Sequence, residues 1–447
     1  MDSKQPETSN KSESSTKSTN YPGMWRFRNN PEYCSIYRVP NRLHRVNPEA
    51  YTPQLVLIGP LNHSLKSQAS KSLGDITDKK SMGYLNMEEH KKIYLAKYEQ
   101  EFGDVGICRR IIEENEEKIR ESYSESTAWI KSQEFVEMIL YDCIFIVQFI
   151  LKSATRNKEK TGDPLIDEPC LQVTVQQDLL LLENQLPYFI LNELFDERAS
   201  EIFQCRPFTF RQLIIFFLVL DDLTQIHSNS KFSYFTDLNN SKFSHFTDLN
   251  RCARIYKRNE ITQGSYKAIE HMYNADKLAS GGVKFEAIVN TSLINVRFEN
   301  GCLKMPCLWV EDDTEMKLRN IMALEQCHYP HEAHVCNYFA FLDQLVDTDK
   351  DVDLLVEKGI MKNWIGQHSL VADMVNKLNM GVINHGSYYY DIAAEVNAHY
   401  TNPYQRSKAI LKRVYFGNMW IGTATVAAVL LLLMTLIQTV ASMIQAL

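Results

Sequence analysis

The sequence predicts a mainly α-helical protein, with a large helical body, a small inserted antiparallel β-sheet and a C-terminal transmembrane helix. Three observations lead to this fold class. Apolar residues recur with helical spacing in most segments between residues 87 and 399. Residues 283–310 instead alternate apolar and polar side chains, as strands do. The last 34 residues carry no charged side chain.

Length and composition are those of a globular body. The chain has 447 residues, of which 45% are hydrophobic and 23% charged, as in ordinary folded domains. The net charge of −7 is spread along the chain. This argues against a nucleic-acid partner, because phosphate binding needs a basic patch. We expect a disordered N-terminal tail (1–30), a globular body (31–405), and a basic flank with a membrane anchor (406–447).

The body is expected to begin with extended chain and to continue with helices. Prolines punctuate residues 21–59 and prevent long helices, so we expect extended chain with one strand. Residues 64–81 are rich in Ser, Lys and Gly and predict a loop. Apolar periodicity then predicts helices over residues 87–101, 107–123, 132–152, 173–185, 187–195 and 208–220.

An 11-residue segment, residues 230–240, is followed directly by a near-copy, residues 241–251. Two copies are too few for a solenoid, which needs at least three units to bury a core. We therefore expect a loop that was duplicated on the surface.

The second half of the body contains the predicted sheet. Residues 283–288 and 293–298 alternate, and Asn300-Gly301 is a strong hairpin signal before residues 303–310. A small antiparallel sheet over about 283–310 follows from this pattern. Helices are then expected over residues 314–326, 335–346, 352–357, 371–378 and 391–399, and from about Tyr404 into the membrane.

The C-terminal run is long enough to cross a bilayer. It extends from Trp420 through Leu430 and Leu433 to Val440, and a bilayer core about 30 Å thick needs roughly 20 apolar residues. The alternative is the core helix of a globular domain, but a core helix seldom runs this long without a charge. Basic and aromatic residues precede the run, as expected at a headgroup interface: Lys408, Lys412, Arg413, Tyr415 and Phe416.

The lipid bilayer is thus the predicted partner of the C-terminal helix. Residues 1–20 lack the apolar core of a signal peptide. The basic flank favours a cytosolic body, with the plasma membrane or endoplasmic reticulum as the membrane. Ten cysteines without disulfide-scaffold spacing fit a reducing compartment. The chain also has four glycosylation sequons, which would be used only if the body were extracellular: Asn10, Asn62, Asn239 and Asn290.

One short segment concentrates possible zinc ligands. Cys327, His331, His334 and Cys336 lie within ten residues, and zinc binds four such ligands as a tetrahedron. The spacing matches no recognised finger, and the two later histidines are one residue too close for the i, i+4 spacing of the protease motif. We expect a helix end and a polar loop here, and neither a metal nor a cofactor.

A second polar segment lies within a leucine-rich stretch. Glu183, Asn184 and Gln185 precede Pro187, and such groups must be hydrogen-bonded if they are buried. We interpret them as residues that end one helix and orient the next. Asp142 is a lone charge in an apolar helix, and we expect it to pair with a basic residue.

Several stretches together carry a family resemblance. The chain resembles the plant family of domain of unknown function 247, also called uncharacterised protein family 0481, over roughly residues 33–440. The similar stretches are residues 36–40, 51–60, 87–91, 178–189, 282–285, 325–328 and 395–397, with the terminal anchor. This chain departs from the family at Leu61-Asn62-His63, where relatives often have paired histidines.

The resemblance implies a plant membrane-associated protein without established activity, some of whose relatives are associated with self-incompatibility and reproductive control. It supplies no catalytic residue. We expect a non-enzymatic recognition or signalling component with a protein partner. The alternatives are an enzyme of unknown reaction type, with a site near Glu88, His90 and Glu183, and a membrane scaffold. A cleft that gathers Glu88, Glu183 and His63 would favour the enzyme, whereas a broad apolar surface patch would favour binding.

Overall fold

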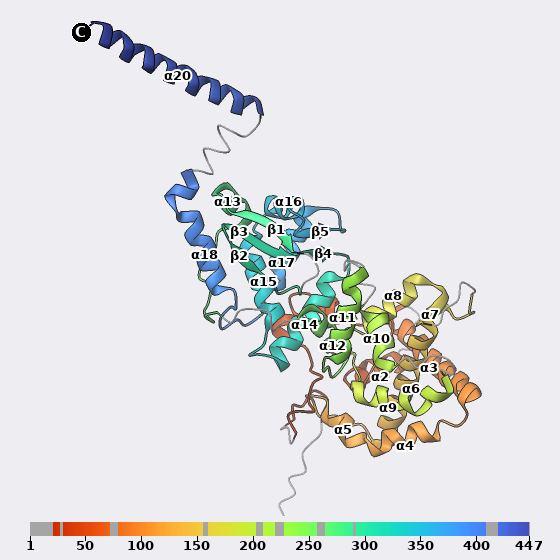
Figure 1. Cartoon of the computed structure of the whole chain (residues 1–447). Coiled ribbons are helices and arrows are strands. Elements are labelled where there is room, and N and C mark those ends of the chain that lie inside the picture. The colour runs from red at the N-terminus through yellow and green to blue at the C-terminus, as the bar shows by residue number, and fades with distance from the viewer. Residues whose placement is uncertain are drawn as a thin grey trace, which may run out of the picture.

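The computed structural model describes residues 21–26, 30–71, 79–154, 160–202, 209–219, 228–256, 264–288, 292–407 and 419–446. Helices form most of this described chain, strands form small sheets, and a long apolar helix stands at the C-terminal end (Figure 1). The prediction of a mainly α-helical protein with a small inserted sheet and a long apolar C-terminal helix is therefore confirmed. The expected N-terminal tail lies mostly outside the described residues.

The first part of the body is helical and is built around α6 (Ser132–Ala154). This helix is apolar on most sides and packs against α3, α4, α9 and α10, so almost its whole length is buried. The other elements of this part are α1 (Asn41–His44), η1 (Pro48–Tyr51), η2 (Pro60–Asn62), α2 (His63–Lys71), α3 (Lys79–Phe102), α4 (Gly106–Glu114), α5 (Glu116–Glu121), α7 (Pro164–Asp167), α8 (Pro169–Asp178), α9 (Tyr188–Ile202), α10 (Phe210–Leu218), α11 (Ser228–Asn240) and α12 (Phe246–Arg254).

The second part of the body surrounds the strands with helices (Figure 1). Its strands are β1 (Lys284–Ile288), β2 (Arg297–Glu299), β3 (Cys302–Pro306), β4 (Leu308–Val310) and β5 (Met361–Asn363). Its helices are α13 (Ala275–Ser280), α14 (Thr314–His328), α15 (His334–Leu345), α16 (Asp349–Glu357), α17 (His368–Leu378) and α18 (Tyr390–Thr401).

The inserted sheet is mixed rather than antiparallel throughout. The predicted hairpin is present: β2 pairs antiparallel with β3, and both turn residues have positive φ, 52° at Asn300 and 73° at Gly301. However, β3 lies between β2 and β1 and runs parallel to β1. The antiparallel prediction is wrong for that pair, because alternation identifies strands without fixing which strand lies beside which. The third strand also ends at Pro306, and β4 pairs in parallel with β5 in a separate sheet.

Buried side chains form two large hydrophobic cores. One gathers residues between 36 and 253, and the other gathers residues between 255 and 396. A smaller cluster joins them, with Tyr37 and Tyr51 from the N-terminal segment packed near Leu182 and Leu324. The N-terminal segment thus lies between the two cores. The predicted single body over 31–405 stays a prediction.

Three expected local structures in the first part are wrong. Residues 64–71 of the expected loop lie in α2, and its residues 79–81 lie in α3. The helix predicted over 173–185 ends at Asp178, and the residues after it form turns. The described residues between 21 and 59 contain isolated bridges and no strand. For residues 54–59 tertiary contacts override the local pattern, because side chains of distant elements bind the backbone there.

The duplicated segment is not a surface loop. The first copy lies in α11, whereas the second copy forms a short connection and then α12. His245 at the start of α12 is buried, and its ring nitrogen lies 3.0 Å from the Ser35 carbonyl oxygen. Arg251 is buried against Glu325 of α14, with Nε 2.9 Å from Oε1. Near-identical sequences therefore fold differently, because only the second copy meets these partners.

The C-terminal helix α20 spans Met419–Ala446 and stands apart from the rest of the chain in Figure 1. Leu430 is 57% exposed and Val440 is 49% exposed, and Leu433 is likewise exposed. Trp420 lies in its first turn. The basic and aromatic flank expected before the helix falls in residues 408–418, outside the described residues.

Candidate functional site

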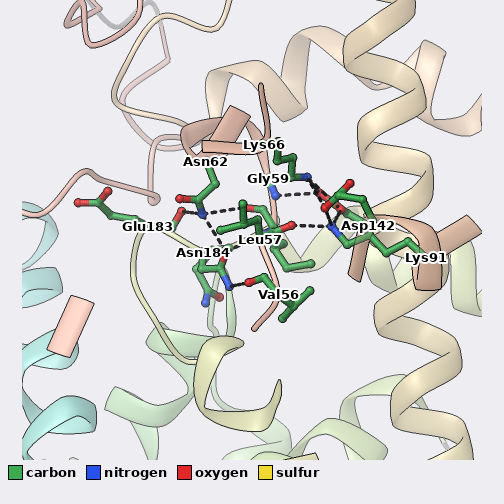
Figure 2. Close-up of polar contacts among 12 residues, drawn as sticks. Val56, Leu57, Gly59, Asn62, Lys66, Lys91, Asp142, Glu183 and Asn184 are labelled. Carbon is green, nitrogen blue, oxygen red and sulfur yellow. Dashed lines mark hydrogen bonds and ion pairs between the residues drawn. The ribbon is translucent and has the colours of Figure 1, made fainter. Parts of the chain in front are cut away.

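A buried polar network lies where the chain segment 54–62 crosses α3, α6 and the connection between α8 and α9 (Figure 2). Residues 54–59 of the segment form neither helix nor strand, and in the described chain no strand pairs with them. Its backbone N–H groups must still be satisfied, since buried donors without partners cost stability. Side-chain oxygens from distant elements supply the acceptors.

Asp178, the last residue of α8, binds the start of the segment. Its carboxylate accepts the backbone N–H groups of Gln54, Leu55 and Val56 at 2.7–2.8 Å. Burial raises the pKa of the Asp178 carboxyl to about 6, although these three donors act in the opposite direction. One carboxylate thereby replaces the hydrogen bonds that a neighbouring strand would make.

Asn184 binds the middle of the segment. Its Oδ1 accepts the N–H of Ile58 at 2.6 Å, and its Nδ2 donates to the carbonyl oxygens of Val56 and Asp178. Asn62 donates to the same Oδ1 at 2.8 Å (Figure 2). Both amides are buried, so each holds a fixed orientation in the core.

Asp142 and two lysines bind the end of the segment. Asp142 of α6 accepts the N–H of Gly59 at 2.8 Å and pairs with Lys91 at 2.6 Å and with Lys66 at 3.1 Å. Lys91 also donates to the Leu57 carbonyl oxygen and to Glu88. The expectation that Asp142 pairs with a basic residue is confirmed.

Interactions with the two lysines keep the buried Asp142 carboxylate charged. Burial would raise the pKa of the Asp142 carboxyl, but Lys66 and Lys91 outweigh it and lower that pKa. Burial lowers the pKa of the Lys66 ammonium. Lys91 is fully buried, yet Asp142 and Glu88 raise its pKa against the effect of burial. The positive charges of the two lysines equal the negative charges of the two carboxylates. This charge balance is typical of a structural ion cluster rather than of a free proton donor.

Gly59 is required at the centre of the network. Its φ is 73°, and a Cβ atom there would lie 2.7 Å from the Gln185 carbonyl oxygen. That carbonyl also accepts the Tyr123 hydroxyl at 2.9 Å. Any side chain at position 59 would separate the segment from the α8–α9 connection.

The polar residues predicted in the α8–α9 connection bind several parts of the fold. Gln185 donates to the carbonyl oxygens of Leu179 and Leu181 and accepts the N–H of Phe246 at the start of α12. Pro187 immediately precedes α9, which begins at Tyr188. The connection therefore joins the N-terminal segment to the second copy of the duplication.

Glu183 faces away from the lysine cluster (Figure 2). Its carboxylate pairs with Arg38 at 2.7 Å and accepts the N–H of Val39 at 2.8 Å. Arg38 also forms two bonds with Glu125. Burial raises the pKa of the Glu183 carboxyl, although Arg38 opposes the shift. The contacts of Glu183 are those of a residue that fixes the N-terminal segment.

The structure does not bring the possible catalytic residues together. Glu88 pairs with Lys91, whereas Glu183 pairs with Arg38 at the other side of the network. The His63 ring lies 2.7 Å from Glu134. His90 is half-buried on α3. The groove beside Glu395 and the groove beside Asp178 are each lined by none of these residues.

The possible zinc ligands are also dispersed. Cys327 lies near the end of α14, His331 lies in the following turn, and His334 begins α15 and stacks on Tyr388. Cys336 is buried, with its Sγ 3.7 Å from the Met322 carbonyl oxygen. Within the described ranges, no three His, Cys, Asp or Glu side chains are grouped so that they could hold a metal ion.

Sequence reasoning missed Lys91 and Asp178 as members of the network. Lys91 shares the buried stripe of α3 with Met87, Tyr94 and Tyr98. Helical spacing of these apolar residues could have identified it as a buried lysine that needs a carboxylate partner. Asp178 gave no comparable signal, because its role depends on segment 54–56 from elsewhere in the chain.

Comparisons with known proteins place the chain among plant proteins. The model of domain of unknown function 247, described as "Plant protein of unknown function", matches residues 36–434. The chain is 25% identical to the UPF0481 protein At3g47200 of Arabidopsis thaliana over 91% of this chain and 86% of that protein. It is 26% identical to the UPF0481 protein At3g02645 of the same species over 36% of this chain and 31% of that protein. No solved structure matches the chain.

Proposed function

This chain belongs to the plant family of domain of unknown function 247, and from that premise we propose that it is a membrane-tethered recognition protein without catalytic activity. In this proposal α20 (Met419–Ala446) crosses the membrane and the body binds a protein partner at its surface. Recognition is also the role implied by the resemblance to relatives associated with self-incompatibility. The proposal rests on two features of the chain itself.

The exposure of α20 carries the proposed tether. Its segment Thr423–Gln445 has 23 residues and a mean hydropathy of 2.2. No residue in the most apolar 18-residue stretch of this segment is buried. At 1.5 Å per residue this segment is roughly 35 Å long, which matches a hydrocarbon core of about 30 Å. By contrast, α6 also has 23 residues but is packed against neighbouring helices on most sides. An apolar helix without such neighbours favours a bilayer as its surroundings.

The bonding of the buried polar network supports a non-enzymatic body. Asp142, Asp178, Glu183 and Asn184 each bind backbone groups of the N-terminal segment. A general acid or base needs a reacting group within hydrogen-bond reach, whereas these oxygens already serve the fold. We therefore propose that binding takes place elsewhere on the body.

Membrane fractionation tests the tether. Truncation after Lys408 should move the protein from the membrane pellet to the soluble fraction after carbonate washing. A full-length variant with Leu430→Arg and Leu433→Arg should behave like the truncation, since each arginine at the centre of a span costs about 2.5–3.5 kcal/mol of insertion free energy. If either protein stays in the pellet, α20 is not the anchor.

Cross-linking in native membranes tests recognition. Tagged full-length protein, treated with an amine-reactive cross-linker in sealed plant membranes, should yield a discrete species larger than the 51.8 kDa chain that contains a second protein. The truncated protein should lose this species if the membrane surface concentrates the partner. Recovery of the uncross-linked chain alone, under conditions that cross-link a known membrane complex, would contradict the proposal.

A further inference from the structure

A groove of about 500 Å³ lies between α18 and the segment that contains β2. Asp391, Ile392 and Glu395 line it from one side of α18, as their i, i+1, i+4 spacing allows. Its size is typical of ligand-binding pockets. None of the residues of the buried polar network lines it, so it is a separate feature of the molecule.

The groove is bordered by the free edge of β2. Five consecutive residues, 295–299, line it. Of these, Arg297, Phe298 and Glu299 form β2, and Asn295 and Val296 precede it. Side chains of a strand alternate between the two faces of a sheet, so three consecutive strand residues that border one groove place the groove along the strand's edge. In the sheet order β1-β3-β2, the strand β2 is outermost, and no strand of the described chain pairs with its outer side.

The hairpin turn fixes which backbone groups point outward. Asn300 and Gly301 form a two-residue turn, which is closed by hydrogen bonding between Glu299 and Cys302. Hydrogen-bonded and non-hydrogen-bonded pairs alternate along an antiparallel ladder. Phe298, opposite Leu303, is therefore in a non-hydrogen-bonded pair, and its N–H and C=O point away from β3. They face the groove.

Two contacts hold the walls of the groove together. The Tyr389 hydroxyl donates to the Ile294 carbonyl oxygen at 2.8 Å near one end. The rings of Phe298 and His399 meet edge to face at 5.7 Å near the other. His399 follows Tyr389 by ten positions along α18, which is roughly 15 Å at 1.5 Å per residue. An extended chain covers that length with about four or five residues.

The charges of the lining favour a basic ligand. Arg297 is the cation, and three carboxylates accompany it, those of Glu299, Asp391 and Glu395, which leaves a net charge of −2. Glu299 pairs with Lys304, and Asp391 accepts the N–H of Ser265 at 2.7 Å. Glu395 is exposed at the groove, and no hydrogen bond or ion pair to it is present in the described chain. Tyr388 adds an aromatic surface.

We propose that this groove binds an extended peptide segment of a partner protein that carries lysine or arginine. The segment adds to the outer edge of β2 by hydrogen bonding to Phe298, and it places a basic side chain against Glu395 and Tyr388. The inference rests on the proposed recognition function and assigns a site and a partner chemistry to it. Because α18 precedes α20 in the chain, the bound segment would lie on the part of the body that leads to the anchor.

Peptide selection on the full-length protein in detergent tests the groove. A phage-displayed library of random decapeptides, selected on the wild-type protein alone, is the probe, and the selected peptides are then titrated against the wild type and Glu395→Lys. We expect the selected peptides to be enriched in lysine and arginine and to bind Glu395→Lys at least tenfold more weakly. The control is Glu89→Lys on the distant α3, which should bind the peptides as the wild type does. Glu299 cannot serve as the control position because it also lines the groove.

A matched pair of variants tests strand addition. Phe298→Pro removes the outward-pointing N–H and breaks no hydrogen bond between β2 and β3. Phe298→Ala removes the same ring and keeps the N–H. A selected peptide should bind Phe298→Pro about tenfold more weakly than Phe298→Ala. If Phe298→Pro fails to fold, methylation of single backbone nitrogens in the peptide replaces it, and at least one methylated position should abolish binding to the wild type.

The outcomes separate the site from the function. Peptides that bind Glu395→Lys and the wild type equally, or that tolerate methylation at every position, would overturn the groove proposal and leave recognition standing. Failure of the library to yield any basic peptide would also overturn it, as would self-association of the chain through this groove. Failure of recognition itself would show in the membrane cross-linking experiment, which does not depend on the groove.

Discussion

At the scale of residues, most of the buried polar side chains in this body bind backbone groups that no helix or strand pairs. Asp178, Asn184 and Asp142 accept N–H groups over the short segment 54–59. Glu325 does the same for α15, accepting the N–H groups of Val335 and Cys336 while it pairs with Arg251. Loss of one such acceptor leaves a buried donor without a partner, which costs about 1–3 kcal/mol.

Glu183→Ala should therefore lower the stability of the full chain. The Val39 N–H loses its acceptor and Arg38 loses one of two carboxylates, so we expect the free energy of unfolding to fall by about 1–3 kcal/mol. Thermal melting in detergent measures the change. Glu89→Ala is the control, since Glu89 is 70% exposed and its pair with Lys92 contributes little. A Glu183→Ala protein that melts at or above the wild-type temperature and yet loses a cellular function would contradict the structural role.

His245 should make stability depend on pH. Burial lowers the pKa of its imidazole from 6.5 to about 4, so between these values the unfolded chain binds more protons than the folded one. The free energy of unfolding therefore falls as the pH drops through this window, by about 3 kcal/mol in total. His245→Asn can still cap α12 without titrating, and it should flatten the slope in urea unfolding between pH 6.5 and 4.5.

The control for this pH dependence is His385→Asn at an exposed position, which should keep the wild-type slope. Asp178 contributes the opposite slope, because its pKa is raised to about 6 and its stability contribution falls as the pH rises toward that value. Only the difference between His245→Asn and the wild type is therefore diagnostic. Equal slopes in the two proteins would exclude His245 as the group responsible.

At the scale of elements, helices were predicted well from the sequence where apolar residues recur with helical spacing. Prediction failed where contacts between residues far apart in the chain determine the local structure. The expected helices 132–152, 314–326 and 371–378 correspond to α6, α14 and α17 within a few residues. The Asn300-Gly301 turn was also predicted. By contrast, the strand expected before residue 59 is absent from the described chain, because side chains of α6 and the α8–α9 connection bind its backbone instead.

The candidate site shows the same division. The side chains of Asn184 and Gln185 could be recognised as groups that need partners, but the partners themselves could not be named from the sequence. Lys91 was recognisable from its place on an apolar stripe. The groove beside β2 was not, because it depends on α18 lying against the free edge of a strand that is far from it in the chain.

The duplication gives a prediction at this scale, because equivalent positions of the two copies have different surroundings. Arg251 is 2% exposed and pairs with the fully buried Glu325, whereas the equivalent Asn240 is exposed. Arg251→Asn should destabilise the full chain by about 3–5 kcal/mol, since it leaves a buried carboxylate without its partner. Asn240→Arg, the reverse exchange, should change stability by less than about 0.5 kcal/mol.

Urea unfolding of the two single variants measures both effects. If Arg251→Asn and Asn240→Arg change the free energy of unfolding equally, the two copies are interchangeable and the different structures assigned to them are wrong. A large loss in Arg251→Asn alone would show that the second copy is part of the core, where a duplicated surface loop would tolerate the change.

At the scale of the whole molecule, the proposal is that a body with two hydrophobic cores is held at a membrane by one exposed apolar helix. Glycosylation of Asn62 does not report which side of the membrane the body occupies. Asn62 is buried and its Nδ2 donates to Ile58, Glu183 and Asn184, so a glycan at Asn62 is incompatible with this fold on either side of the membrane. Asn10 and Asn290 lie outside the described residues.

Protease protection in sealed microsomes tests the tether and its orientation together. With a tag after Leu447, added protease should digest the body and leave a small tagged fragment that contains α20 and stays in the membrane pellet. After detergent is added, the fragment should become accessible to the protease. A full-length chain protected in the sealed microsomes would place the body on the other side of the membrane. Complete digestion without a protected fragment would contradict the central claim that α20 crosses the bilayer.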